Sequence, residues 1–166
     1  MEKIKWICKH FNELSALEYH HILFLRIEVF VVEQNCPYQE VDEKDIVAYH
    51  LFGLNKKNEV VAVTRILPQG VSYQEVSIGR VAIKKTYRGT GLAHELMLES
   101  FAAMENIYGK QPIRISAQEY LVNYYSAHGF KQVGEMYLED DIPHVEMVRH
   151  CGIKPQSQKD GGSNPP

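Results

Sequence analysis

The spacing of apolar and polar residues divides the chain into runs typical of strands and runs typical of helices. β-Branched and aromatic residues dominate the runs at residues 3–10, 49–54, 60–67, 76–83, 113–117, 130–138 and 144–150. Apolar residues recur at helical spacing in the runs at residues 16–32, 92–108 and 120–128. Because strands precede, separate and follow the helices, this pattern predicts a mixed α/β fold with an antiparallel first half.

Local signals mark the ends of the first two helices. Ser15 is a suitable N-cap, and Glu18 three residues later completes a capping box. Gly109 predicts the end of the second helix, with Pro112 just beyond it. The first helix is expected to bury four apolar side chains, namely Leu17, Ile22, Leu25 and Val29.

Two of the strand runs lie close together in the sequence. Residues 49–54 and 60–67 flank a short polar segment at 55–59, which predicts an antiparallel hairpin. Residues 34–45, which precede this hairpin, are polar and acidic and contain Pro37. We therefore expect an acidic loop between the first helix and the hairpin.

Length and charge narrow the class of protein. The chain has 166 residues, and we expect one domain at residues 1–151 followed by a disordered tail at 152–166, rich in Pro, Ser and Gly. The net charge of −3 argues against a nucleic-acid partner. Residues 1–6 lack the apolar core of a signal peptide, and no apolar run approaches the length that spans a membrane. We expect a cytoplasmic protein with no membrane partner.

The cysteines point to the same compartment. Cys8, Cys36 and Cys151 are odd in number and widely spaced, and no pair has the Cys-x-x-Cys spacing. This favours free thiols in a reducing cytoplasm over disulfides or a zinc site, so we expect no metal. Cys36 is a conceivable covalent nucleophile, but the sequence places no obvious base beside it.

The segment with the clearest chemistry joins the strand at 76–83 to the helix at 92–108. Its residues 88–93 read Arg-Gly-Thr-Gly-Leu-Ala, a glycine-bearing loop that runs into a helix N-terminus. Unpaired amides and the helix dipole make such an end suitable for phosphate or pyrophosphate. A Walker A loop would need Lys-Ser/Thr after Gly91, and a dinucleotide fingerprint would need glycine at His94. The loop fits neither pattern.

The pattern Arg88-x-x-Gly91-x-Ala93 resembles the Gln/Arg-x-x-Gly-x-Gly/Ala signature of the GNAT N-acetyltransferases. Three further segments, at residues 29–42, 78–81 and 141–144, resemble the ElaA-like branch of that family. The resemblance covers about residues 26–147. It implies the GNAT acyl-CoA N-acyltransferase fold, with a central, mostly antiparallel sheet of about seven strands flanked by helices.

The resemblance also implies acetyl-CoA as co-substrate and a primary amine of a small molecule or peptide as acceptor, attacked directly in a ternary complex. The resemblance places the cofactor against the strand at 76–83, which we call the signature strand, and against the loop after it and a later helix. The implied cofactor-binding residues are Val81, Ala82, Ile83, Arg88, Gly89, Thr90, Gly91, Leu92, Ala93 and Asn123.

Tyr125 is the candidate general acid. It lies four residues before Gly129-Phe130, matching the Tyr-x-x-x-Gly-Phe pattern of the family, whereas Tyr124 is expected in the core. A phenol with a pKa near 10 can protonate a thiolate whose conjugate acid has a pKa near 8.5.

The general base and the acceptor site are less defined by the sequence. Candidate bases are Glu33 on the acidic loop and the imidazole of His144, with His50 as an alternative. Glu40, Asp42 and His50 are candidate acceptor-binding residues, because negative charge attracts a cationic amine. Other readings stay open: a longer acyl donor, a catalytically silent CoA-binding sensor, and a homodimer formed through an edge strand near the C-terminus.

Overall fold

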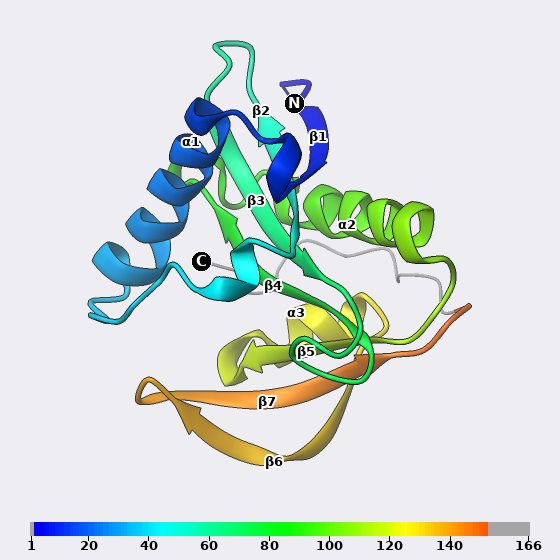
Figure 1. The fold of residues 1–166 in the computed structure, drawn as a ribbon. Coiled ribbons are helices and arrows are strands. Elements are labelled where there is room, and N and C mark those ends of the chain that lie inside the picture. The colour runs from blue at the N-terminus through cyan, green and yellow to red at the C-terminus, as the bar shows by residue number, and fades with distance from the viewer. Residues whose placement is uncertain (1, 153–166) are drawn as a thin grey trace.

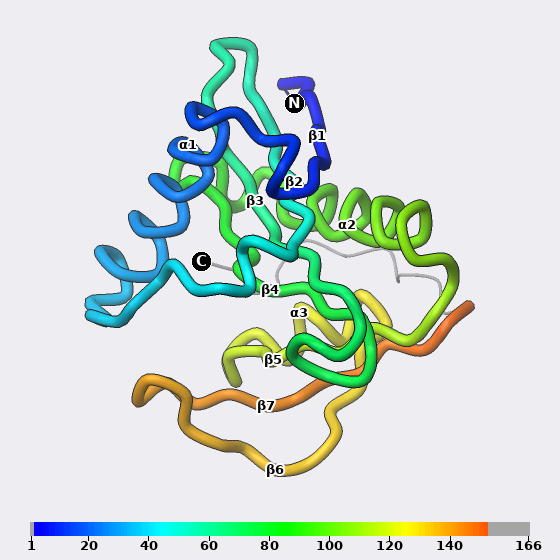
Figure 2. The backbone as a smooth tube through the Cα atoms, viewed as in Figure 1, coloured from blue at the N-terminus to red at the C-terminus, as the bar shows by residue number. Residues whose placement is uncertain are grey.

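The computed structural model describes residues 2–152, which form a seven-stranded sheet with helices on both faces (Figures 1 and 2). The strands are β1 (Lys5–His10), β2 (Tyr49–Leu54), β3 (Val60–Leu67), β4 (Val76–Ile83), β5 (Ile113–Gln118), β6 (Lys131–Glu139) and β7 (Ile142–Arg149). The helices are α1 (Ala16–Ile27), α2 (Leu92–Tyr108) and α3 (Val122–Ala127). Apart from Gly152, the predicted tail at 152–166 lies outside the described residues. The mixed α/β class is confirmed.

The strand order across the sheet is β1-β2-β3-β4-β5-β7-β6. All neighbours are antiparallel except β4 and β5, which run parallel. Antiparallel neighbours need only short turns, whereas the parallel pair needs a long crossover, and α2 supplies it. The hairpin predicted at residues 49–54 and 60–67 is confirmed, and so are the signature strand and the helix at 92–108.

Helix α1 begins at the predicted capping box, in which Ser15 and Glu18 cap each other's backbone amides. It buries Ile22, Leu25 and Arg26 against β2, β3 and β4, and the following π-helical turn Glu28–Glu33 buries Val29. The expectation that Leu17 is buried is wrong, since its side chain is 64% exposed. Leu17 lies five positions before Ile22, about 140° around the helix and outside the buried face.

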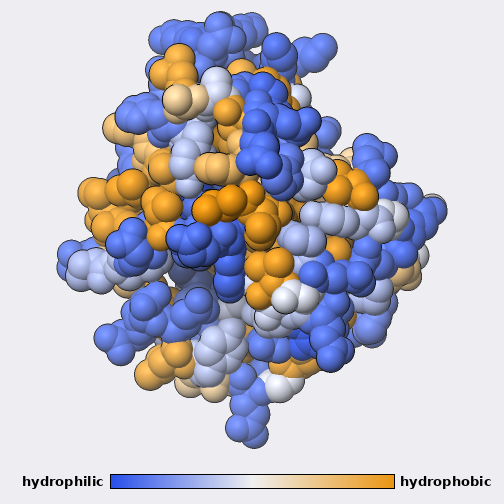
Figure 3. Space-filling view, viewed as in Figure 1, coloured by the Kyte–Doolittle hydropathy of each residue, from blue (hydrophilic) through white to orange (hydrophobic). Residues whose placement is uncertain are grey.

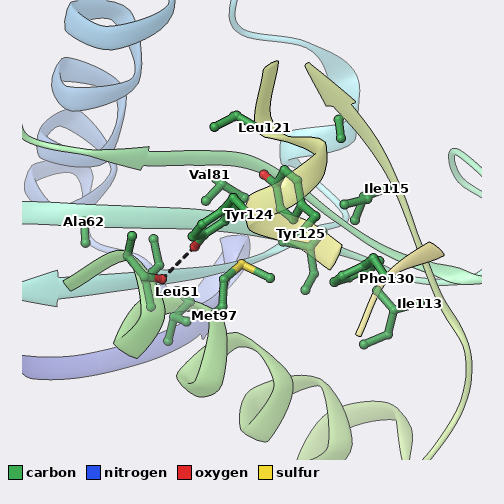
Figure 4. Close-up of a cluster of buried hydrophobic side chains, with 14 of the residues drawn as sticks. Leu51, Ala62, Val81, Met97, Ile113, Ile115, Leu121, Tyr124, Tyr125 and Phe130 are labelled. Atoms are coloured by element: carbon green, nitrogen blue, oxygen red, sulfur yellow. Dashed lines mark hydrogen bonds between the residues drawn. The ribbon is translucent and has the colours of Figure 1, made fainter. Parts of the chain in front are cut away.

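Helix α2 covers the opposite face of the sheet together with α3. Its buried side chains include Leu92, Ala93, Leu96, Met97 and Met104. Figure 4 shows part of this core, where Met97 lies beside Tyr124 and Tyr125 of α3. Gly109 ends the helix as predicted, with a φ of +76° that a glycine adopts without strain.

No helix within residues 2–152 combines the length and the apolar composition needed to cross a membrane.

Candidate active site

The parallel strands β4 and β5 separate soon after they begin. They pair only at Val76 with Ile113 and Ser77 with Arg114, although β4 continues to Ile83 and β5 to Gln118. The remaining edges of the two strands therefore diverge and leave room in the middle of the sheet. The backbone polar groups along these edges are available to a ligand.

A β-bulge lies in β4 at this point. The register pairs Val63 with Ala82 and Arg65 with Gly79, so two residues of β4, Arg80 and Val81, lie opposite a single residue of β3. Arg80 has a φ of +51°, in the left-handed region that a non-glycine residue adopts at a cost. A bulge redirects the backbone groups of its strand, and this one does so beside the gap between β4 and β5.

A cavity of about 520 Å³ opens at this gap, and we call it the central cavity. It is lined by β4 from Ser77 to Val81, by Ser116 and Gln118 of β5, by Tyr125 of α3, and by segments from three loops. Figure 3 shows this face hollowed between α1 and the β6–β7 hairpin, with hydrophilic side chains around the opening. Its size is ordinary for a small-molecule site.

The loop before α2 presents backbone amides without protein partners. Gly89 and Gly91 have φ values of +75° and +86°, and Gly91 is the N-cap of α2 with no side-chain cap. Within the described part of the chain, no group accepts a well-aligned hydrogen bond from the amides of residues 89–93. Together with the dipole of a 17-residue helix, these amides fit a pyrophosphate.

Arg88 and Glu33 contact each other beside this loop. Arg88 Nη2 lies 2.7 Å from Glu33 Oε2 in an ion pair that lacks the alignment of a hydrogen bond. Arg88 Nε donates to the carbonyl oxygen of Ile83 at 3.1 Å. Glu33 therefore faces the end of β4 and is not among the residues that line the central cavity.

Tyr125 reaches the central cavity from α3. Its side chain is 6% exposed, and its hydroxyl makes no hydrogen bond to any described residue, although it is not sealed from solvent. Burial raises the pKa of Tyr125 above its ordinary value, which keeps the phenol protonated near neutral pH. Its neighbour Tyr124 points the other way and donates to the Ala93 carbonyl oxygen at 2.8 Å, as Figure 4 shows. Tyr124 belongs to the core, as expected.

His144 of β7 also lines the central cavity. Its Nδ1 lies 2.8 Å from the carbonyl oxygen of Ile142, which can only accept, so Nδ1 carries the proton in the neutral ring. Nε2 is then left with a lone pair and lies 3.9 Å from Glu139 Oε2. A neutral imidazole held in this tautomer can accept a proton through Nε2.

The acidic loop carries little free negative charge, because arginines bind its carboxylates. Arg26, which is 1% exposed, donates to Glu40 Oε2 at 2.6 Å and to Asp45 Oδ1 at 2.9 Å. Burial alone would raise the pKa of Asp45, but hydrogen bonds from Arg26 and Arg65 outweigh it and lower the pKa to about 2. Arg26 thus ties α1 to the loop from the core side.

Asp42 and Glu40 have a second pair of arginine partners on the sheet. Arg65 Nη1 lies 2.6 Å from Asp42 Oδ1 and 2.9 Å from Asp45 Oδ1, and Arg80 Nε donates to Glu40 Oε1 at 2.9 Å. We call Arg26, Glu40, Asp42, Asp45, Arg65 and Arg80 the charge cluster. Neither Glu40 nor Asp42 lines the central cavity.

His50 and Asn123 lie away from the central cavity as well. His50 is buried, its Nε2 is 3.0 Å from the carbonyl oxygen of Asp45, and burial lowers its pKa. Asn123 is exposed on α3. The three cysteines have free thiols, and no group of three potential metal-binding side chains occurs within residues 2–152.

Sequence reasoning missed several charged residues that line the central cavity, namely Lys44, Arg65, Arg80, Glu139 and Asp140. A signal for two of them exists. Arg65 and Arg80 each interrupt an apolar strand, and a charge in such a position requires a buried partner or a ligand.

A family model for the GNAT acetyltransferase domain matches residues 15–151. The ElaA protein of Escherichia coli K12 is 39% identical over 148 residues, which is 88% of this chain and 96% of ElaA. Both comparisons span nearly all of the described fold.

Solved structures agree with the sequence comparisons. An acyl-CoA N-acyltransferase from Pseudomonas aeruginosa has a TM-score of 0.84 and 43% identity, covering 89% of this chain and 99% of that structure. The crystal structure of Escherichia coli ElaA has a TM-score of 0.83 and 38% identity, covering 89% of this chain and all of ElaA. The chain therefore belongs to the GNAT acetyltransferase family and is an ElaA-like member of it.

Proposed function

We propose that the protein transfers an acetyl group from acetyl-CoA to a primary amine, by direct attack of the amine in a ternary complex. Family membership supports acyl transfer from an acyl-CoA in general. The observation that carries the finer proposal is the combination of diverging strands, a cavity between them and uncapped amides at residues 89–93. Val81 lines the cavity and leads, through the end of β4, to the loop with those amides.

The chain would hold acetyl-CoA along one continuous stretch. The amides of residues 89–93 would bind the pyrophosphate, and Arg88 would add positive charge beside them by exchanging its ion pair with Glu33 for the ligand. Backbone groups of Val81, Ala82 and Ile83 would bind the pantetheine arm along the open edge of β4. Asn123 on α3 is a further candidate contact. Acetyl-CoA supplies the acetyl thioester, which would lie in the gap between β4 and β5.

The first task of the chain is to deprotonate the acceptor amine. Removing its proton near pH 7 costs about 4–5 kcal/mol when the pKa is close to that of lysine. His144 is the base we favour, because it lines the cavity and its Nε2 lone pair is free to accept the proton. Glu33 remains a candidate from the sequence, but its ion pair with Arg88 gives it a different role in this structure.

The second task is to assist bond exchange at the carbonyl carbon. The amine nitrogen forms the new C–N bond while the C–S bond breaks and its electron pair moves to sulfur. The bulge at Arg80 and Val81 supplies a backbone donor for the carbonyl oxygen in our proposal. Tyr125, which burial keeps protonated at neutral pH, then donates its hydroxyl proton to the departing thiolate. The amine nitrogen loses its second proton as the amide forms, and a proton from solvent restores the Tyr125 hydroxyl.

Two rival functions make different predictions. A CoA-binding sensor would bind the cofactor and transfer nothing, and a transferase with a longer donor would prefer a longer acyl-CoA. The test is calorimetry with acetyl-CoA followed by thiol release over a panel of amines and acyl donors. Binding without turnover for every amine would contradict our proposal, and faster turnover with a longer acyl-CoA would contradict the acetyl donor.

We also propose a cytoplasmic location for the protein. The free thiols of its three cysteines agree with a reducing compartment.

A further inference from the structure

One wall of the central cavity is cationic. Lys44, Arg65 and Arg80 line it together with Ser72 and Tyr73 of the β3–β4 loop. A different wall, formed by the β6–β7 turn, carries Glu139 and Asp140 near His144. The cavity thus presents positive and negative charge from separate segments of the chain.

The cationic wall has hydrogen-bond donors that the protein does not use. Arg65 is 4% exposed, and only its Nη1 donates to carboxylates, while its Nε is buried without a partner among the described residues. Arg80 binds Glu40 through Nε and Nη2 and makes no hydrogen bond within residues 2–152 through Nη1. Lys44 Nζ donates to Ser72 Oγ at 2.8 Å, which uses one of its three hydrogens.

The charges of this wall leave one positive charge in excess. The three arginines of the charge cluster are matched by its three carboxylates, and Lys44 is the additional cation. A single excess charge matches a monoanion better than a phosphate dianion. A carboxylate also accepts from guanidinium and ammonium donors in the geometry that arginine favours.

We propose that this wall binds the carboxylate of the acceptor, so that the acceptor is an amino acid or a related aminocarboxylate. The inference rests on the proposed function, since it names the substrate class of the same site. Bound in this way, an acceptor would direct its amine away from Lys44 and toward the rest of the cavity, which includes His144. At this wall the excess positive charge of Lys44 disfavours a polyamine, which has no anionic group, whereas Glu139 and Asp140 lie on the other wall, beside which the amine of the acceptor would lie.

The test compares acceptors that differ only in the carboxylate. The full chain is incubated with acetyl-CoA and either the twenty standard amino acids, their carboxamides, or spermidine, and acetylated products are quantified by mass spectrometry. We expect at least one amino acid to have a kcat/KM about tenfold or more above its carboxamide, the size expected from a lost charge-assisted contact. Equal or faster acetylation of carboxamides or spermidine would overturn the proposal and leave the proposed function standing.

A matched pair of variants tests whether the preference for the carboxylate comes from Lys44. Lys44→Gln should reduce the preference for the preferred amino acid to about threefold or less, through a higher KM with little change in kcat. Lys131→Gln removes the same charge from an exposed position on β6 and should leave the preference unchanged. An unchanged preference in Lys44→Gln would contradict the assignment of this wall.

A binding measurement separates this proposal from the proposed function. The CoA-loaded chain is heated with N-acetylglycine or with N-acetylglycinamide, and the two shifts in melting temperature are compared. We expect a larger shift with the carboxylate in the wild type and equal shifts in Lys44→Gln. Equal shifts in the wild type would overturn the carboxylate site. Absence of acetyl transfer to every amine, with the carboxylate shift retained, would overturn only the proposed function.

Discussion

Backbone amides of the loop before α2 lack partners within the described chain, whereas three acidic side chains of the loop before β2 are paired. At residues 89–93 the backbone amides point to no acceptor within the described chain, and no side chain caps the helix. At residues 40–45 each of Glu40, Asp42 and Asp45 has an arginine within ion-pair distance. The amides of the first loop are left open to a ligand, whereas the carboxylates of the second loop are bound by arginines of the fold.

This difference indicates that polar groups without a protein partner are better candidates for a binding site than polar groups that are already paired. Both loops are polar and both border the central part of the sheet, so composition alone does not distinguish them. Buried polar groups are normally satisfied inside the protein, as the carboxylates of the second loop are, whereas the amides of the exposed residues 89–91 stay open to water or a ligand. The four predictions below test whether the first loop and its cavity are functional and the second structural, beginning with the largest effect.

The charge cluster should be essential for stability. Arg26→Met leaves Glu40 and Asp45 without their main buried partner, and we expect a loss of about 3–5 kcal/mol in the free energy of unfolding. Urea denaturation measures it. Lys9→Met is the control, since the pair of Lys9 with Glu18 is half-exposed and its loss should cost about 1 kcal/mol or less. A similar small loss for Arg26→Met would mean that the cluster does not hold the loop.

Substitution of a cavity residue should lower the rate of catalysis and leave stability largely unchanged. Tyr125→Phe should lower kcat by about 100-fold or more, the range of a lost general acid, with the affinity for CoA nearly unchanged. Tyr124→Phe is the matched control, and we expect it to cost about 1 kcal/mol of stability through the hydrogen bond to Ala93. Unaltered turnover of Tyr125→Phe, with chemistry rate-limiting, would remove this residue from the mechanism.

Acid should weaken the charge cluster through Asp45. Its pKa is about 2 in the folded protein and 3.8 for an unperturbed carboxyl, as in the unfolded chain, so its ionised form stabilises the fold above pH 3.8. We expect this contribution, about 2 kcal/mol from the size of the shift, to be lost as the pH falls from 4 to 2. In urea denaturation over that range, the free energy of unfolding should fall more steeply with decreasing pH for the wild type than for Asp45→Asn. Identical slopes would show that Asp45 is not held in this way.

The loop before α2 should show a smaller effect that is specific to the ligand. Gly91→Ala places a side chain at a φ of +86° and should weaken CoA binding about tenfold by shifting the amides around it. Gly109→Ala imposes similar strain at the other end of α2, where φ is +76°. Calorimetry with CoA should find the affinity of Gly109→Ala unchanged. Equal loss in both variants would mean that strain in α2, and not the amides, lowers the affinity.

The sequence was informative wherever local chemistry decides the structure. The capping box at Ser15, the strand at 76–83 and the glycines around α2 have local causes, and all were predicted with their bounds. Leu17 was placed wrongly because a helix buries a face, and its position lies off that face.

Pairings between distant residues were beyond the sequence. Arg26 and Asp45 are brought together by the packing of α1 on the sheet, so the neutral state of the acidic loop had no local signal. The bulge at Arg80 depends on the register of β3 against β4, which the apolar pattern of β4 does not encode. The cationic wall of the cavity had a partial signal, because Arg65 and Arg80 interrupt apolar strands, but their position beside Lys44 depends on the fold.

The most direct test of the central claim compares a ligand that carries the pyrophosphate with one that lacks it, in the wild type and in Gly91→Ala. The purified chain is titrated by calorimetry with CoA and with pantetheine, which lacks the pyrophosphate and the nucleotide. If the amides of residues 89–93 bind that group, CoA will bind at least about 100-fold more tightly than pantetheine, and Gly91→Ala will weaken the binding of CoA only. Equal affinities for the two ligands, or no affinity for CoA, would contradict the account.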